Sequence, residues 1–190
     1  MIILTGPSAS GKTATCLYLQ EHYHIRKVIT HTTRAIRAGE KNDVDYHFVD
    51  VDTFLKLKNE GKFIETVFYN GNYYGTSKDE VRIDKCMAVE LEGAKTYKSL
   101  NDPRMVLFYM KVDEKIRVAR MKERGDDIKK IESRLLNDRT AFELDDKMRA
   151  LIDVIVDTEH HDIASAAEFI FNKYIQILKE KNIEVDNLLK

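Results

Sequence analysis

The amino-acid sequence predicts an α/β protein with a mainly parallel central sheet that is covered by helices on both faces. Two observations carry this prediction. Short apolar runs of strand length alternate along the chain with longer segments of helical periodicity, which is typical of strand–helix–strand units. The most apolar run, Met105 to Val112, reads M-V-L-F-Y-M-K-V and is typical of a buried strand near the centre of a sheet.

The first apolar run, residues 2–4, leads into the sequence G-P-S-A-S-G-K-T. Glycine, four residues, then Gly-Lys-Thr is the phosphate-binding loop signature, placed as required between a strand and a helix. Small residues let backbone N–H groups converge on phosphate oxygens, and the helix that follows adds the positive end of its dipole. The alternative is a chance Gly/Ser turn, which the intact motif disfavours. The candidate ATP-binding residues are Gly6, Pro7, Ser8, Ala9, Ser10, Gly11, Lys12 and Thr13.

Two residues of this loop have a predicted chemical role. Lys12 is expected to reach the β- and γ-phosphates, and the Thr13 hydroxyl is expected to bind Mg²⁺. The sequence therefore predicts a protein that binds ATP together with Mg²⁺.

Periodicity and turn residues predict the remaining elements in order. We expect helices at residues 12–22, 51–60, from Gly93, at 114–136 with a break at Gly125, and at 163–178. We expect further strands at residues 27–30, 46–49, 63–69, 72–75, 86–91 and 152–156. Asn70-Gly71 between two aromatic-rich runs predicts a hairpin turn. A helical pattern also returns at Lys78, and the polar tail after Lys179 is expected to fray.

Length and composition indicate one soluble globular domain. The chain has 190 residues, of which 43% are hydrophobic and 33% charged, and its formal net charge of −1 excludes a bulk attraction to nucleic acid or an anionic membrane. No apolar run approaches the roughly 20 residues that a membrane span needs, so we expect a cytoplasmic protein without nucleic-acid or membrane partners. Cys16 and Cys86 lie far apart in apolar surroundings and are expected to be free thiols.

Each of three polar features outside the loop has two possible interpretations. Arg34 and Arg37, followed by Tyr46, form either a clamp for a second phosphate group or a solvated loop. Glu65 in the run F-I-E-T-V-F either meets a ligand amide or faces solvent on an alternating strand. Residues 114–136 carry four arginines and are either a closing lid or an ordinary charged helix pair.

Six separated blocks together resemble the guanylate kinase family, in the order and at about the spacing of that family. They are G-P-S-A-S-G-K-T, T-H-T-T-R-A-I-R-A-G-E, V-D-Y-H-F-V, G-K-F-I-E, G-N-Y-Y-G-T and the late R-G pair, and they span Met1 to about Tyr174. The resemblance implies an ATP:GMP phosphotransferase with a three-layer P-loop fold. It implies a core at residues 1–30 and 77–190, a small β-rich GMP-binding insert at 31–76, and a helical lid within about 120–138.

The resemblance also implies roles for individual residues. Thr30, Glu65 and Thr76 resemble the residues that read guanine, because a carboxylate can accept from guanine N1–H and the 2-amino group together. The residues that resemble those holding the GMP phosphate are Arg34, Arg37, Tyr46 and Tyr74. The residues implied to be catalytic are Lys12, Arg34, Arg120, Arg124 and Arg134. The implied partners are ATP, GMP and dGMP, and the sequence leaves monomer and homodimer open.

One block departs from the family pattern. Where the family commonly has D-[IV]-D-x-Q-G, this chain has A-V-E-L-E-G at residues 88–93. Ala88 replaces one acidic residue, and Glu90, which is expected to reach the base or a metal-bound water, replaces the other. Two alternatives to GMP phosphorylation therefore stay open: a kinase of another phosphorylated acceptor, and a non-catalytic phosphopeptide-binding module of the same family.

Overall fold

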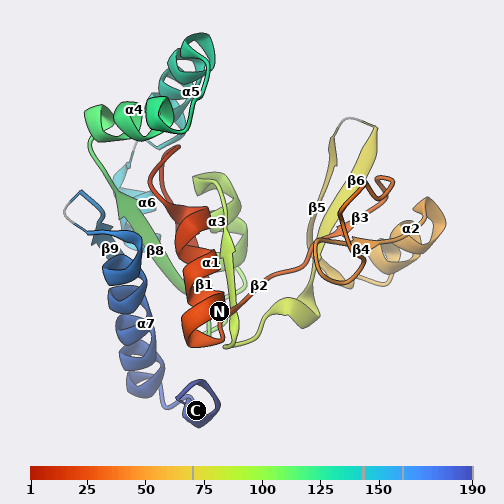
Figure 1. Ribbon diagram of the computed structural model, residues 1–190. Helices are drawn as coiled ribbons and strands as arrows, with labels where there is room; N and C mark the ends of the chain where they lie inside the picture. The colour runs from red at the N-terminus through yellow and green to blue at the C-terminus, as the bar shows by residue number, and fades with distance from the viewer. Residues whose placement is uncertain (70, 143, 160, 190) are drawn as a thin grey trace.

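Two β-sheets organise the chain (Figure 1), which a computed structural model describes for residues 1–69, 71–142, 144–159 and 161–189. The first sheet has five strands, all parallel, in the order β2 (Arg26–Lys27), β7 (Lys85–Ala88), β1 (Ile2–Thr5), β8 (Val106–Lys111) and β9 (Val154–Asp157). The predicted parallel sheet is confirmed, and β1 lies at its centre with the apolar strand β8 beside it.

Successive residues of β1 point to opposite faces of the sheet, as in any strand. Ile2 and Leu4 pack against α1 (Lys12–Tyr23) and α7 (Ile163–Glu180) in one buried apolar cluster, whereas Ile3 packs against α3 (Leu91–Lys98) in another. The sheet is therefore covered on both faces, which makes the three layers that the sequence predicts.

Aspartate side chains cap the N-termini of the later α-helices. Asp113 caps α4 (Glu114–Glu123), Asp127 caps α5 (Ile128–Ala141), Asp145 caps α6 (Asp146–Leu151) and Asp162 caps α7. In each case the carboxylate accepts hydrogen bonds from backbone N–H groups of the first turn, which otherwise have no partner inside the helix. The expected helical hairpin is confirmed as α4 and α5, which lie near the loop after β1 (Figure 1).

The second sheet lies to one side of the first (Figure 1), in the order β4 (His47–Phe48), β3 (His31–Thr32), β6 (Asn72–Ser77) and β5 (Phe63–Tyr69). Its helix, α2 (Val51–Asn59), buries Phe54 against the rings of Phe63 and Tyr73. The expected hairpin is the antiparallel pair β5 and β6. Asn70 of its predicted turn lies outside the described residues.

Several predicted elements differ from the structure. The strand predicted at 86–91 ends at Ala88, because the chain turns there so that Leu91 enters the core as the first residue of α3. The helix predicted from Lys78 is a single 3₁₀ turn, η1 (Lys78–Glu80). Fraying after Lys179 is also wrong. Another 3₁₀ turn, η2 (Asp186–Leu188), packs Val185 and Leu188 into the cluster around α7.

Two further findings bear on the expectations from composition. Cys16 and Cys86 are free and buried, and they lie close together, with the Cys86 sulfur 3.9 Å from the Cys16 carbonyl oxygen. No helix in the described part of the chain is long and apolar enough to cross a membrane.

At Gly6 the fold leaves no room for a side chain. A Cβ at this position would lie 2.6 Å from the Met110 carbonyl oxygen of β8, and its φ of +144° is one that L-residues rarely adopt. Gly6→Ala is therefore expected to lower the free energy of unfolding by more than about 2 kcal/mol, as measured by urea denaturation.

Gly125→Ala is the matched control, because Gly125 has a φ of +81° but a Cβ there meets nothing within 4 Å. Its expected cost is backbone strain alone, about 1 kcal/mol. Equal losses in the two variants would contradict the close approach of the loop to β8.

Candidate active site

The loop between β1 and α1 is shaped for binding phosphate. Three residues hold the left-handed backbone conformations that turn the chain sharply: Gly6, Ala9 with a φ of 60° and Gly11 with a φ of 99°. The loop lies at the carboxyl end of β1 and at the N-terminus of α1, where unpaired N–H groups and the helix dipole favour an anion.

Buried hydroxyl groups surround this loop. Among the residues that the structure describes, the buried Oγ atoms of Thr5, Ser10 and Thr15 have no hydrogen-bond partner. Buried polar groups are normally paired, either within the protein or with ordered water.

Lys12 lies over the loop. Its Nζ donates to the carbonyl oxygens of Gly6 and, at 3.1 Å, Pro7, and it lies 5.6 Å from the centre of the Phe142 ring. Burial lowers the pKa of Lys12, and the negative charges of Glu90 and Asp138 partly oppose this shift. A bound polyphosphate would supply the negative charge that favours the ammonium form.

A buried ion pair that the sequence analysis did not identify anchors the loop. Arg117 of α4 and Asp138 of α5 are joined at 2.6 Å, and their side chains are only 7% and 8% exposed. The Asp138 carboxylate also accepts from Ser8, whose N–H and hydroxyl donate at 3.0 and 3.1 Å. The position of Ser8 is therefore fixed by the helical hairpin.

The predicted lid arginines divide into two groups. Arg120 is at the loop, where it donates to the carbonyl oxygens of Ala9 at 3.3 Å and Thr158 at 2.8 Å. Arg124 and Arg134 instead share the carboxylate of Asp126, the latter at 2.6 Å. Arg124 lines the same cavity as the loop, whereas Arg134 does not.

Three adjoining cavities extend from the loop toward the second sheet. The first, about 640 Å³, is lined by residues 9–13 of the loop, by Arg120 and Arg124, and by residues 161–163. Thr13 also lines the second, about 290 Å³, whose other walls include Lys27 and Ala88. Thr30 and Met87 line both the second cavity and a third of about 530 Å³. The three cavities thus follow one another from the loop to the second sheet, and each shares lining residues with the next.

The third cavity brings together the four residues implied to meet the base: Thr30, Glu65, Thr76 and Glu90. Glu65 and Thr76 are direct partners across β5 and β6, and an irregularity between Phe63 and Glu65 locally changes the register. Such irregularities redirect side chains near functional sites. Glu65 is half-buried and lines this cavity, so a ligand contact and a solvent-facing position both stay open for it.

The implied phosphate clamp is partly assembled on the second sheet. The Arg34 guanidinium lies 5.4 Å from the Tyr46 ring centre, and the Tyr46 and Tyr74 rings lie 6.3 Å apart. Glu40, which the sequence analysis did not identify, pairs with Arg34 at 2.7 Å and accepts from the backbone N–H of Arg37. The Arg37 side chain is exposed, so the clamp presents one shielded guanidinium and two phenols.

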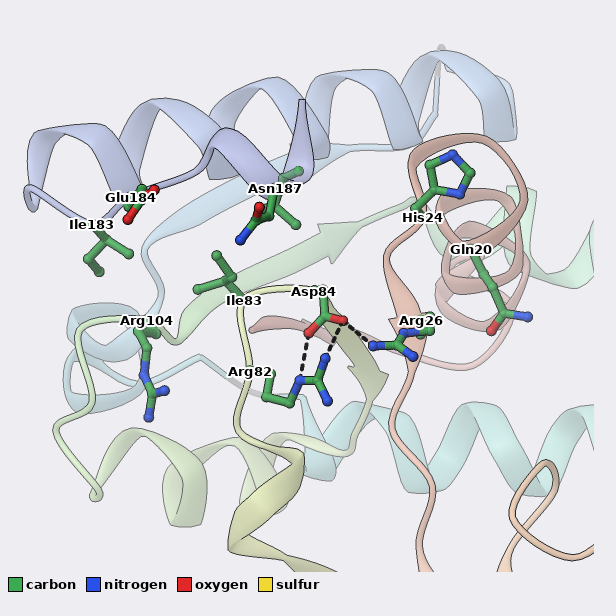
Figure 2. Close-up of a pocket in the computed structure, with 11 residues that line it drawn as sticks. Gln20, His24, Arg26, Arg82, Ile83, Asp84, Arg104, Ile183, Glu184 and Asn187 are labelled. Carbon is green, nitrogen blue, oxygen red and sulfur yellow. Dashed lines mark hydrogen bonds and ion pairs between the residues drawn. The ribbon is translucent and has the colours of Figure 1, made fainter. Parts of the chain in front are cut away.

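A hollow of similar size, about 650 Å³, lies at the opposite end of the first sheet, and Figure 2 shows its lining. Arg82 and Arg26 both point at Asp84, and their hydrogen bonds hold the pKa of that carboxyl low although burial raises it. The C-terminal end of α1 also faces this hollow through Gln20. None of the residues that the sequence predicts to bind phosphate is among the described residues that line this hollow.

Comparisons with known proteins agree with this geometry. The family model described as guanylate kinase matches residues 1–169. A guanylate kinase of Chromohalobacter salexigens is 36% identical over 134 residues, which are 67% of this chain and 62% of that protein. One of Desulfotalea psychrophila is 30% identical over 135 residues, which are 67% of this chain and 66% of the relative. The chain thus spans less than two thirds of the length of these curated relatives.

A solved structure has the same fold. The crystal structure of guanylate kinase from Anaplasma phagocytophilum aligns with a TM-score of 0.60 and 22% sequence identity, covering 93% of this chain and 84% of that one. At this identity the likeness shows the fold alone, which is the predicted P-loop α/β fold.

The Arg117–Asp138 pair generates a prediction about stability. Asp138→Ala leaves a buried guanidinium without its closest partner, so it is expected to lower the free energy of unfolding by about 3 kcal/mol in chemical denaturation. The double variant Arg117→Leu/Asp138→Ala is expected to lose less, because it leaves no buried charge unpaired.

Arg139→Ala is the control, since it breaks the exposed Arg139–Glu114 pair and is expected to cost less than about 1 kcal/mol. If the double variant lost as much stability as Arg117→Leu and Asp138→Ala lose in sum when each is made alone, that result would contradict the coupling of Arg117 to Asp138.

Proposed function

Because this chain belongs to the guanylate kinase family, we propose that it transfers the γ-phosphoryl group of ATP to GMP, giving ADP and GDP. None of the proposed contacts to the base or the phosphate uses the ribose 2′-hydroxyl, so we propose dGMP as a second acceptor.

One observation carries this proposal: the series of cavities from the loop to the second sheet. Thr13 lines the first and second cavities, while Thr30 and Met87 line the second and third. ATP with its phosphates on the loop and GMP with its base at Glu65 would therefore direct their phosphates toward each other. Transfer depends chiefly on this alignment.

In the proposed reaction a GMP phosphate oxygen bonds to the γ-phosphorus as the bond from that phosphorus to the β,γ-bridging oxygen breaks. The attacking oxygen is already anionic, so no general base is required. Lys12 and Arg120 would neutralise charge on the transferring group, and Arg34 would hold the GMP phosphate with Tyr46 and Tyr74. When GMP binds, Arg34 would release the Glu40 carboxylate and pair with the GMP phosphate instead.

Arg124 and Arg134 have a different proposed role. Both pair with Asp126, next to the break between α4 and α5. We propose that they engage the phosphates when a lid within about residues 120–138, the outer part of the helical hairpin, closes over a core of residues 1–30 and 77–190. The insert, residues 31–76, would close from the other side with Arg37 on its exposed loop. Closure would exclude water from the reacting phosphates.

Mg²⁺ is the proposed cofactor. It usually keeps several waters and binds through few protein groups together with substrate phosphates. The Thr13 hydroxyl, exposed where the first two cavities meet, fits such a site, while Ala88 contributes no oxygen ligand there. When bound, the ion would neutralise charge on the β- and γ-phosphates.

The experiment that tests the proposal measures ADP release with Mg·ATP and a panel of GMP, dGMP, AMP, CMP, UMP and dTMP. Turnover is expected with GMP and dGMP alone, because only guanine offers Glu65 two adjacent N–H donors. Lys12→Ala serves as the control and is expected to lose turnover with its unfolding curve unchanged. Turnover with another acceptor, or none with any of them, would overturn the proposal.

A further inference from the structure

Tyr97 of α3 is buried in the core, yet its hydroxyl reaches the third cavity. The side chain is 1% exposed, and its ring packs with Ile3, Ala94 and Leu107 beneath the first sheet. Tyr97 also lines the cavity that holds Glu65 and Thr76. The ring of Tyr97 therefore lies in the apolar core, whereas its hydroxyl borders the third cavity.

The Tyr97 hydroxyl contacts one of the residues implied to read the base. It donates to Oε1 of Glu65 at 3.3 Å, which is long for a bond between two oxygens. Glu65 and Thr76 face each other across β5 and β6. Tyr97 thus connects the second sheet to α3, which packs on the first sheet, at the point where the base would bind.

The direction of this hydrogen bond is fixed by chemistry. Burial raises the pKa of Tyr97, so the phenol keeps its proton at neutral pH. A carboxylate has no proton to donate, so Glu65 accepts and Tyr97 donates. The Tyr97 hydroxyl then occupies one lone pair of Oε1, and the other lone pair of Oε1 and both of Oε2 remain available to a ligand.

We propose that Tyr97 is a positioning residue for guanine recognition, whose hydroxyl holds Glu65 so that its carboxylate can accept from N1–H and the 2-amino group together. This inference rests on the proposed function. A carboxylate that turns freely about its side-chain bonds pays an ordering cost for each bidentate contact. If the protein holds the carboxylate in place before the ligand binds, a ligand with two N–H donors gains more affinity than a ligand with one.

Guanine and hypoxanthine differ in this respect. Both carry N1–H, but hypoxanthine lacks the 2-amino group, so inosine monophosphate makes only one of the two contacts. Loss of the Tyr97 hydroxyl therefore weakens GMP binding more than inosine monophosphate binding. A tyrosine that merely fills the core would affect both ligands alike.

Tyr97→Phe tests this directly, because it removes one oxygen and keeps the ring in the core. By calorimetry, the Kd for GMP is expected to rise about fivefold, while the Kd for inosine monophosphate changes less than about twofold and the Kd for ATP stays the same. Tyr23→Phe is the control, since Tyr23 stacks on Phe171 at the far side of the first sheet. It is expected to leave all three constants unchanged.

Glu65→Gln completes a double-mutant cycle. On its own it is expected to weaken GMP binding, and adding Tyr97→Phe to it is expected to weaken GMP no further, because the hydroxyl acts through the carboxylate. Additive losses, or an unchanged ratio of GMP to inosine monophosphate affinity in Tyr97→Phe, would overturn the inference alone. Absence of GMP binding to the unaltered protein would instead overturn the proposed function.

Discussion

The rest of the site depends on how closely the phosphate-binding loop approaches β8. At Gly6 the backbone passes so near the Met110 carbonyl oxygen that a Cβ would lie 2.6 Å from it. This approach sets the turn that presents the N–H groups of the loop at the start of α1. The Arg117–Asp138 pair then fixes Ser8 from the other side. The loop is thus held by β8 and by the helical hairpin, two elements distant from it in sequence.

The second sheet is joined to the first by two short segments, 28–30 and 78–84, which are tied to each other. The Glu80 carboxylate accepts from the Ile29 N–H and from the buried Lys85 ammonium, both at 2.9 Å. Thr30, which lines two of the cavities, is the residue after Ile29. A movement of the second sheet about these segments would change the cavities near Thr30 without disturbing the loop.

The features that could be predicted from the sequence are those formed by residues close together along the chain. The loop motif, the parallel sheet and the helical hairpin follow from local spacing and periodicity, and the family resemblance supplied Glu65 and Thr76. Arg117, Asp138 and Tyr97 carry no such signal, because their significance lies in contacts between residues 21 to 130 positions apart. Glu40 is local to Arg34, but only the loop conformation reveals that the two pair.

One site is proposed to hold both nucleotides with their phosphates facing each other. Calorimetric titration with a bisubstrate ligand, adenosine and guanosine joined through a chain of five phosphates, would test this arrangement. We expect one bound molecule per chain, tighter binding than either nucleotide alone, and competition by both ATP and GMP. Competition by only one of the two nucleotides would contradict a shared site.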